Sequence, residues 1–260
     1  MKNALIGCTG FVGSTLLNSD WVFDDMFNSS NFTDMTGKIY ETVVCAGFSA
    51  AKWIANKSPK QDLEAISRLL SVVKTIKAKR FILISTIDVY PNPVLVTEEQ
   101  LPIRGVGEPY GKHRLEIECF VRNQFKCFQI VRLPALFGNG LRKNYIFDLI
   151  TRDRVEYINP NSFLQWYPMS RFHSDLKLIA NSDVPLINIA VEPVKTEDIV
   201  SIFFPDIKIA PKHSRPFYYD MRTINPHVLS GEGHYHFSAD ESLMAMKQYL
   251  ALVASRGNKP

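Results

Sequence analysis

The sequence is poor in the features that mark secreted, membrane-bound and disulfide-rich proteins. Its 260 residues contain four cysteines without a C-x-x-C pair or a regular spacing: Cys8, Cys45, Cys119 and Cys127. Such cysteines are expected to be small buried side chains in a reducing compartment. No apolar stretch is long enough to span a bilayer, and the residues before Gly7 are too few for a signal peptide. We therefore expect a cytoplasmic protein without a membrane partner.

Charge of one sign is not concentrated anywhere along the chain. The formal net charge is only +4, and the densest basic run contains Lys74, Lys77, Lys79 and Arg80. This run falls at the end of a predicted helix, where positive side chains suit the negative end of the helix dipole. We therefore expect a solvated helix terminus and no nucleic-acid partner. His234 and His236 have no third ligand nearby in sequence, so we expect a surface loop and no metal site.

What the chain does contain is an alternation of strand and helix patterns, without repeats, low-complexity stretches or flexible linkers. Short apolar runs predict strands at 4–6, 22–27, 42–46, 81–85, 128–133 and 186–190. Helices are predicted at 59–76, at 110–123 and, after a capping box at 238–241, up to residue 250. This alternation predicts an α/β fold with a doubly wound parallel sheet, because parallel strands need crossover connections. Residues 1–260 are expected to form a single domain.

The most informative motif is Gly7-Cys8-Thr9-Gly10-Phe11-Val12-Gly13, which directly follows the predicted strand 4–6. In a strand–turn–helix of this type, the first glycine permits a tight turn and the second lets a pyrophosphate approach the backbone. The third glycine lets the helix pack closely on the strand, and the helix dipole favours phosphates. The motif predicts a dinucleotide site in a Rossmann fold. The alternative is a glycine-rich turn without a ligand.

Two later segments carry candidate catalytic side chains. The predicted strand 81–85 runs into Thr86 and Asp88, which places them at a strand's carboxyl end, where open parallel sheets bind ligands. Tyr110 and Arg114 are four residues apart on a predicted helix and therefore share a face. A fixed cation beside a phenol stabilises the phenolate, so we expect Arg114 to lower the Tyr110 pKa from about 10. Such a phenol can exchange a proton with an alcohol while a hydride moves to or from a nicotinamide.

Together these segments resemble the extended short-chain dehydrogenases/reductases, the NAD-dependent epimerase/dehydratase family. The resemblance runs from the glycine motif through the strand end at 43–47, the motif Ser85-Thr86-x-x-Val89-Tyr90, the Tyr110 helix and the segment 132–138. It implies that Thr86 orients the substrate and that Tyr110 is the acid/base. Arg114 stands where the family has a lysine that binds the nicotinamide ribose. The implied cofactor contacts are Gly7, Thr9, Gly10, Phe11, Val12, Gly13, Asn28, Cys45, Ala46, Gly47, Tyr110, Arg114 and Pro134.

Several departures from the family pattern bear on the cofactor and the substrate. Asn28 lies where the family carries an acidic residue for the adenosine ribose, and no arginine is nearby for a 2′-phosphate. This favours NAD as the cofactor without excluding NADP. Arg114 replaces the family's lysine, and Asp62 falls where relatives usually have asparagine. Ala135 replaces an asparagine that contacts the substrate diphosphate in sugar-nucleotide epimerases.

One further departure concerns the reaction. Asp88 stands where sugar dehydratases have a glutamate, but Ile87 replaces their preceding aspartate. Elimination of water needs an acid and a base besides the tyrosine, so the pattern disfavours dehydration. Asp88 is either a catalytic residue or a hydrogen-bonded turn residue.

The second half of the chain is less informative. By the resemblance, its short length implies a small C-terminal substrate lobe, to which residues 140–235 contribute. Asn144 and Arg171 are the candidate substrate contacts, since a guanidinium group in particular can hold a phosphate. Trp166 and Tyr167 fit either a stacking surface for a base or sugar, or the core of the lobe.

Three functions follow from these observations. The favoured one is an NAD(P)-dependent oxidoreductase or epimerase that acts on a sugar nucleotide or a related polyol, with Tyr110 as acid/base. The first alternative is a dinucleotide-binding regulator or subunit with reduced catalysis, which the arginine at position 114 makes credible. The second is a reductase of a small carbonyl compound, which a small lobe would suit. The expected partner is a small-molecule substrate, and a homodimer is compatible with the sequence.

Overall fold

The computed structural model describes residues 1–17, 20–209 and 215–257. The chain forms two compact units, and neither is one continuous segment. The first unit consists of Met1–Asn92, Glu98–Leu133 and Phe172–Asn188. The second consists of Pro93–Thr97, Pro134–Arg171 and Ile189–Pro260. The predicted lobe 140–235 therefore lies in the second unit, except for residues 172–188, which belong to the first.

The first unit is built on a six-stranded sheet with the order β10-β6-β4-β3-β1-β2. All neighbouring strands are parallel, which confirms the predicted doubly wound sheet. The chain begins at β1, adds β2 on one side and then β3 on the other, so the strand order reverses beside β1. Ligands of open parallel sheets bind at such a reversal. The strands are β1 (Asn3–Ile6), β2 (Asp25–Phe27), β3 (Ile39–Cys45), β4 (Lys77–Thr86), β6 (Phe128–Leu133) and β10 (Leu186–Asn188).

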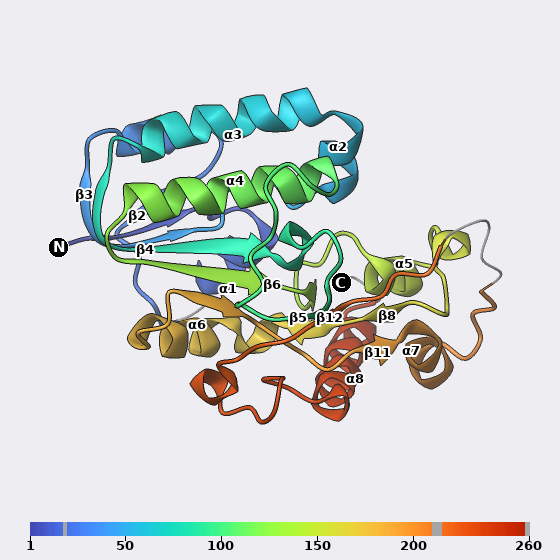
Figure 1. The fold of residues 1–260 in the computed structure, drawn as a ribbon. Helices are drawn as coiled ribbons and strands as arrows, with labels where there is room; N and C mark the ends of the chain where they lie inside the picture. Colours follow the sequence, from blue (N-terminus) through green and yellow to red (C-terminus); the bar gives the residue numbers. More distant parts are fainter. Residues whose placement is uncertain (18–19, 210–214, 258–260) are drawn as a thin grey trace. The chain divides into compact units, whose positions relative to one another are not determined.

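Helices cover both faces of this sheet (Figure 1). The long helices α3 (Pro59–Val73) and α4 (Pro109–Gln124) lie side by side on one face, and the short α2 (Lys52–Lys57) contacts both. On the other face, α1 (Phe11–Leu17) contacts α6 (Phe172–Asn181). Apolar side chains of α3 and α4 form one buried cluster with those of the strands. Two 3₁₀ turns complete the unit, at Phe32–Met35 and Ile87–Val89.

The prediction that the basic run is a helix terminus holds for Lys74, the exposed C-cap of α3, and is wrong for the other three residues. The helix ends at Val73, and Lys77, Lys79 and Arg80 belong to β4, which starts four residues before the predicted strand. The start of β4 pairs with β3, where Ile39 lies opposite Lys77. Exposed and half-buried residues alternate along this stretch, so the basic side chains stay in solvent while the backbone completes the ladder.

The described residues of the second unit form three two-stranded sheets. These pair β7 (Ala135–Phe137) with β9 (Trp166–Pro168), β8 (Phe163–Leu164) with β11 (Val194–Lys195) and β5 (Val94–Val96) with β12 (Asp220–Met221). Its helices are α5 (Tyr145–Thr151), α7 (Thr196–Phe203) and α8 (Ala239–Ser255), and its 3₁₀ turns are Val155–Tyr157, Met169–Arg171 and Pro226–Leu229. Trp166 and Tyr167 are fully buried, so they belong to the core.

The C-terminal helix α8 begins with the predicted capping box. The backbone of Ser238 donates to the carboxylate of Glu241 at 2.8 Å, and the backbone of Glu241 donates to the Ser238 hydroxyl at 3.2 Å. The helix continues to Ser255, five residues beyond the predicted end. The expectation of a surface loop at 234–236 holds for His234 but is wrong for His236, which is buried.

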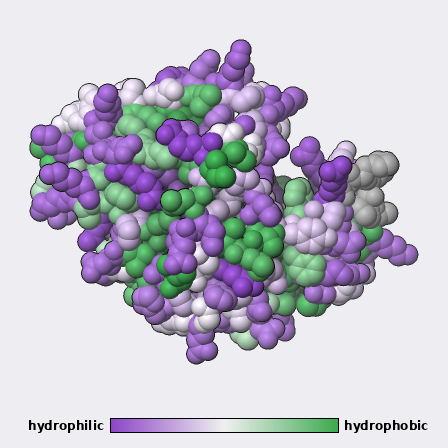
Figure 2. All heavy atoms as spheres, in the orientation of Figure 1, coloured by the Kyte–Doolittle hydropathy of each residue, from purple (hydrophilic) through white to green (hydrophobic). Residues whose placement is uncertain are grey.

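The surface carries both hydrophilic and hydrophobic side chains, and Figure 2 shows patches of hydrophobic residues on one face. Apolar atoms form much of any folded surface, so these patches do not by themselves mark a binding site. Within the described ranges, no helix combines the length and the apolar character needed to cross a membrane.

Candidate functional site

The glycine turn lies between β1 and α1, at the carboxyl end of the sheet. Gly7 has a φ of +88°, and a Cβ there would lie 2.4 Å from the carbonyl oxygen of Ala46. A Cβ on Gly13 would lie 2.1 Å from the carbonyl oxygen of Gly7. At Gly10, in contrast, a Cβ would meet only that same oxygen, at 3.3 Å. Packing thus requires glycine at positions 7 and 13, whereas Gly10 is exposed and a Cβ there would meet one atom only, with Thr9 beside it also exposed.

The neighbouring strands β2 and β3 complete the wall around this turn. The backbone N–H groups of Gly7 and Cys8 donate to the Phe27 carbonyl at 2.7 and 3.1 Å, which fixes the turn to the end of β2. Beyond it, Asn28 accepts bonds from the backbone and hydroxyl of Ser30 at 2.8 and 2.6 Å. Its carboxamide oxygen is therefore committed to a local turn.

At the end of β3, the thiol of Cys45 is fully buried, and burial raises its pKa to about 12. It is therefore a packing residue and not a reactive thiol. Ala46 donates to the Ile6 carbonyl at 2.8 Å, and Gly47 packs against the Ile6 side chain. Phe11 and Val12, at the start of α1, are half-buried. The predicted contacts from the first three strands therefore lie at the carboxyl edge of the sheet in the first unit, although Cys45 is buried there.

Tyr110 lies in the first turn of α4 and is 6% exposed. Its backbone N–H donates to the side chain of Asn56 in α2 at 2.9 Å, which caps one free donor of the helix. A Cβ on Gly111 would lie 1.9 Å from the carbonyl oxygen of Asp88, so this glycine lets α4 approach the end of β4. The close approach brings Tyr110 next to Thr86.

Arg114 lies one turn further along α4, as predicted, with its guanidinium 4.6 Å from the centre of the Tyr110 ring. The expected net effect on the phenol is wrong, however. Burial raises the pKa of Tyr110 above its ordinary value, while the charge of Arg114 and hydrogen bonding from Thr86 and Arg114 only oppose that rise. The negative charge of Asp88 raises the pKa further. Desolvation thus outweighs the arginine.

Asp88 has an ion-pair partner that sequence spacing does not reveal. The ammonium of Lys52, at the start of α2, donates to the Asp88 carboxylate at 2.6 Å. The backbone of Asp88 donates to the Thr86 hydroxyl at 3.2 Å, and that hydroxyl donates to the other Asp88 oxygen at 3.5 Å. Both predicted roles remain compatible with this geometry, since Asp88 is a hydrogen-bonded turn residue that also faces the phenol. Lys52 could be identified as the partner of Asp88 only from the structure, in which the start of α2 lies against the turn after β4.

A second set of charges is buried beneath the site. The guanidinium of Arg132 in β6 donates to both carboxylate oxygens of Glu118 in α4, at 2.9 and 2.6 Å. The Ser85 hydroxyl donates to Glu118 at 2.6 Å, and Arg132 also donates to the Tyr90 hydroxyl at 2.6 Å. These bonds tie α4 to the ends of β4 and β6, directly before Pro134 in the chain. Glu118 was not predicted, although it follows Tyr110 by eight residues on the same helix.

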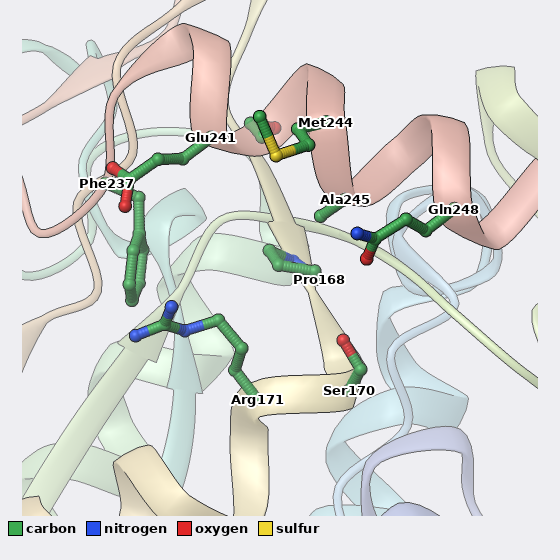
Figure 3. A pocket seen from close by; sticks show the side chains of 9 residues that line it. Pro168, Ser170, Arg171, Phe237, Glu241, Met244, Ala245 and Gln248 are labelled. Carbon is green, nitrogen blue, oxygen red and sulfur yellow. The ribbon is translucent and has the colours of Figure 1, made fainter.

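The two predicted substrate contacts belong to the second unit and have distinct surroundings. Asn144 has a φ of +121° and caps α5: it accepts from Ile146 at 3.0 Å and Phe147 at 3.2 Å, and donates to the Leu136 carbonyl at 2.8 Å. Its side chain is therefore engaged in holding a loop. Arg171 lines a cavity of about 290 Å³, with its guanidinium 4.2 Å from the centre of the Phe237 ring (Figure 3).

That cavity lies in the second unit, between the end of β9 and the first turns of α8. Met244, Ala245 and Gln248 line it from α8, and Pro168 and Ser170 face them (Figure 3). Its lining includes polar and apolar side chains, and the Glu241 carboxylate accepts a bond from the Ser238 backbone in the capping box. The structure describes no group of three or more His, Cys, Asp and Glu side chains that could hold a metal ion.

No protein-family model matches the sequence, and no curated protein matches it significantly. Solved structures nevertheless share its fold. MoeE5 in complex with UDP-glucuronic acid and NAD matches with a TM-score of 0.72 and 17% identity, over 96% of this chain and 99% of that one. The UDP-glucose 4-epimerase of Thermotoga maritima with UDP-glucose matches with a TM-score of 0.72 and 15% identity, over 98% and 100%. A dTDP-4-dehydrorhamnose reductase of Clostridium acetobutylicum matches with a TM-score of 0.73 and 16% identity, over 98% and 100%.

These likenesses confirm the fold that the resemblance implied. They extend over nearly the whole chain, including the second half, where the sequence carries few motifs.

Proposed function

We propose that the protein is an NAD-dependent oxidoreductase or epimerase that acts on a sugar nucleotide, with Tyr110 as acid/base. The observation that carries this proposal lies within the first unit. The open position at Gly10 and the cluster of Thr86, Tyr110 and Arg114 stand at the carboxyl ends of strands in one parallel sheet. The fold adds support, because its solved examples include structures with NAD, UDP-glucuronic acid and UDP-glucose.

The residues at the glycine turn fit a dinucleotide. The protein's own packing accounts for Gly7 and Gly13, whereas an external group in contact with the backbone would account for Gly10. Asn28 leaves no positive charge in its turn, which suits a free ribose hydroxyl better than a phosphate. NAD, when bound, supplies the nicotinamide that accepts or donates a hydride.

The proton chemistry falls to Tyr110. As the phenolate, Tyr110 takes a proton from a sugar hydroxyl during oxidation, and as the phenol it gives that proton back during reduction, while the Thr86 hydroxyl helps to hold the phenol oxygen. Burial favours the protonated form that reduction needs, and the adjacent guanidinium limits the cost of forming the phenolate that oxidation needs. Position 87 is isoleucine and Asp88 is paired with Lys52, and both features disfavour dehydration.

The cofactor assignment is tested by isothermal titration of NAD and NADP. We expect NAD to bind at least as tightly as NADP, and Gly10→Val to abolish binding while the circular dichroism spectrum is unchanged. Gly10→Ala, which adds only a Cβ near the Gly7 carbonyl, should weaken binding less. Unchanged affinity in Gly10→Val would refute the site, and a tenfold preference for NADP, about 1.4 kcal/mol, would refute the role of Asn28.

The catalytic assignment is tested by following NADH absorbance or epimer formation with UDP-glucose, UDP-glucuronic acid and dTDP-sugars. Tyr110→Phe should lower turnover by about 10²–10⁴-fold and leave NAD affinity unchanged. Tyr157→Phe, at a tyrosine of the second unit that is 58% exposed, is the matched control and should be silent. Equal activity of the wild type and Tyr110→Phe would exclude the proposed acid/base.

A second function has one observation in its favour. The Arg114 fork is engaged by Asp62 and by the carbonyl of Ser49, so these donors are not offered to a cofactor ribose. A dinucleotide-binding regulator or subunit with little turnover would tolerate this arrangement. NAD binding without conversion of any of the substrates above would favour this alternative.

A further inference from the structure

Two buried charges meet beside the proposed acid/base. Arg114 donates from its two terminal nitrogens to the two carboxylate oxygens of Asp62 in α3, at 3.3 and 3.2 Å. The same guanidinium donates to the backbone carbonyl of Ser49. The side chains of Arg114 and Asp62 are 5% and 8% exposed. A bidentate pair shielded from water in this way is much stronger and more directional than a surface ion pair.

These anchors determine where the arginine's charge lies. A long arginine side chain has many rotamers, and holding it in one of them needs partners on a rigid support. Asp62 lies on the long helix α3, and Ser49 lies in the loop between β3 and α2, so the helix supplies the rigid anchor and the loop supplies a second acceptor. With the fork bound to them, the guanidinium remains 4.6 Å from the centre of the Tyr110 ring.

We propose that Asp62 is a positioning residue, which holds the Arg114 guanidinium against Tyr110 through the bidentate ion pair. Arg114 then acts on the phenol through its charge, and its fork serves the protein instead of the cofactor ribose. This inference rests on the proposed role of Tyr110 as acid/base. It also explains why two departures from the resembled family, at 62 and 114, occur together: they contact each other.

Other groups around Tyr110 set the background for this effect. Asp88 faces the phenol from the turn after β4 and carries Lys52 of α2 as its counter-ion. Thr86 lies at the phenol oxygen. His113 contacts Asp62 with its Nδ1 at 2.7 Å, so it supports the carboxylate from the other helix. Among the charged groups, Arg114 and Asp88 act most strongly on Tyr110, so Asp62 acts mainly through the arginine.

A lysine at position 114 could not replace the arginine in this arrangement. Its ammonium is a single point of charge and cannot span two carboxylate oxygens and a carbonyl as the planar fork does. We therefore expect Arg114→Lys alone to place its charge on Asp62 and away from the phenol. Asp62→Asn combined with Arg114→Lys removes that competing carboxylate and should recover part of the effect on Tyr110.

The test measures the phenol directly and needs no turnover. 3-Fluorotyrosine placed at position 110 alone is titrated by ¹⁹F NMR, because its ring fluorine lowers the phenol pKa and reports ionisation of this one residue. Arg114→Gln should raise this pKa by about one unit, and Asp62→Asn should raise it by a substantial part of that amount. The double variant Asp62→Asn/Arg114→Gln should have the same phenol pKa as Arg114→Gln, because Asp62 acts on the phenol only through the arginine.

The matched control is Glu116→Gln. It also removes a carboxylate that pairs an arginine with α4, but its partner Arg104 is exposed and it should leave the titration unchanged. If Asp62→Asn does not fold, Asp62→Glu moves the carboxylate by one methylene and should raise the pKa in the same direction. The proposal is overturned if Asp62→Asn titrates as the wild type does, or if the double variant shows the sum of the single shifts.

The outcome separates this inference from the proposed function. Absence of turnover with every sugar nucleotide would refute the enzyme, yet a shifted titration in Asp62→Asn would still establish the positioning role. If the enzyme is active but Asp62→Asn leaves the phenol titration unchanged, the proposed function stands and the positioning role of Asp62 is refuted.

Discussion

The two compact units differ in the kind of polar group that they bury. The first unit buries guanidinium and carboxylate groups, namely Arg114, Arg132, Glu98, Glu118 and Asp175. In the described part of the second unit, the buried polar side chains carry no formal charge at neutral pH: Asn159, Ser162, Gln165, Thr196, Thr223, His236 and Ser242. These neutral groups bond mainly to the backbone, as Gln165 does to Val191 and Met221.

The difference bears on the proton chemistry proposed for Tyr110. A buried charge costs several kcal/mol unless it is paired, but once paired it acts strongly on nearby groups because the surroundings screen it poorly. In the first unit the pairs Arg132–Glu118 and Arg114–Asp62 flank α4, the helix that carries Tyr110. The second unit uses its buried polar groups to hold loops together. Removal of a buried charge should therefore destabilise the first unit, whereas introduction of a charge should destabilise the second.

The largest effect is expected from Glu118→Gln in the first unit. This change leaves the Arg132 guanidinium, which is 1% exposed, without a counter-charge. We expect the free energy of unfolding to fall by about 3–5 kcal/mol, as measured by urea denaturation followed by circular dichroism. Glu116→Gln on the same helix is the control, because solvent screens its exposed pair with Arg104 and the loss of that pair should change the stability little. Equal losses in both variants would show that burial of the pair is not what stabilises this unit.

The next largest effect is expected when acid protonates His236, because this places a charge in the interior of the second unit. Burial, together with the nearby His227, lowers the pKa of His236 to about 4, although the hydrogen bond to the Asn225 carbonyl opposes this shift. Its Nδ1 accepts a bond from the Ala190 backbone at 3.2 Å, and its Nε2 donates to the Asn225 carbonyl at 3.1 Å. Protonation of Nδ1 would break the first bond. Because the folded pKa is depressed, the stability from neutral His236 is complete above about pH 6.5 and is lost as pH falls toward 4.

Urea denaturation at a series of pH values checks this window. Between the two pKa values, His236 should cost up to about 1.4 kcal/mol for each pH unit of acidification. In His236→Gln, which keeps an acceptor without a basic nitrogen, that part of the slope should disappear. A slope that is the same in both proteins would assign the acid sensitivity to other groups.

The smallest effect is expected at Asn144 in the second unit. Asn144→Ala removes the cap of α5 and should cost about 1 kcal/mol, while Asn144→Gly, which suits the positive φ, should cost less. If sugar-nucleotide binding falls as well, by isothermal titration at a temperature where both variants are folded, Asn144 contacts the substrate besides capping the helix. Unchanged binding would confine it to the capping role.

Much of the first unit could be predicted from the sequence, because its signals are local. The glycine turn, the strand before it and the four-residue spacing of Tyr110 and Arg114 each follow from short stretches of chain. The Lys52–Asp88 and Arg114–Asp62 pairs could not be predicted, since their members are 36 and 52 residues apart and meet only when helices pack. In the second unit, the strands are too short to show a hydrophobic periodicity in the sequence. The burial of His236 likewise has no local sequence pattern that predicts it.

The sequence by itself therefore determined the parallel sheet, the helix that carries Tyr110 and the open position at Gly10, because backbone geometry and apolar periodicity act over a few residues. The tertiary structure alone decided the ionic partners and the direction of the Tyr110 pKa. Proximity of Arg114 predicted a lower pKa, but the burial that raises it depends on everything packed around the ring. Desolvation and ion pairing are sums over spatial neighbours, which no short stretch of sequence contains.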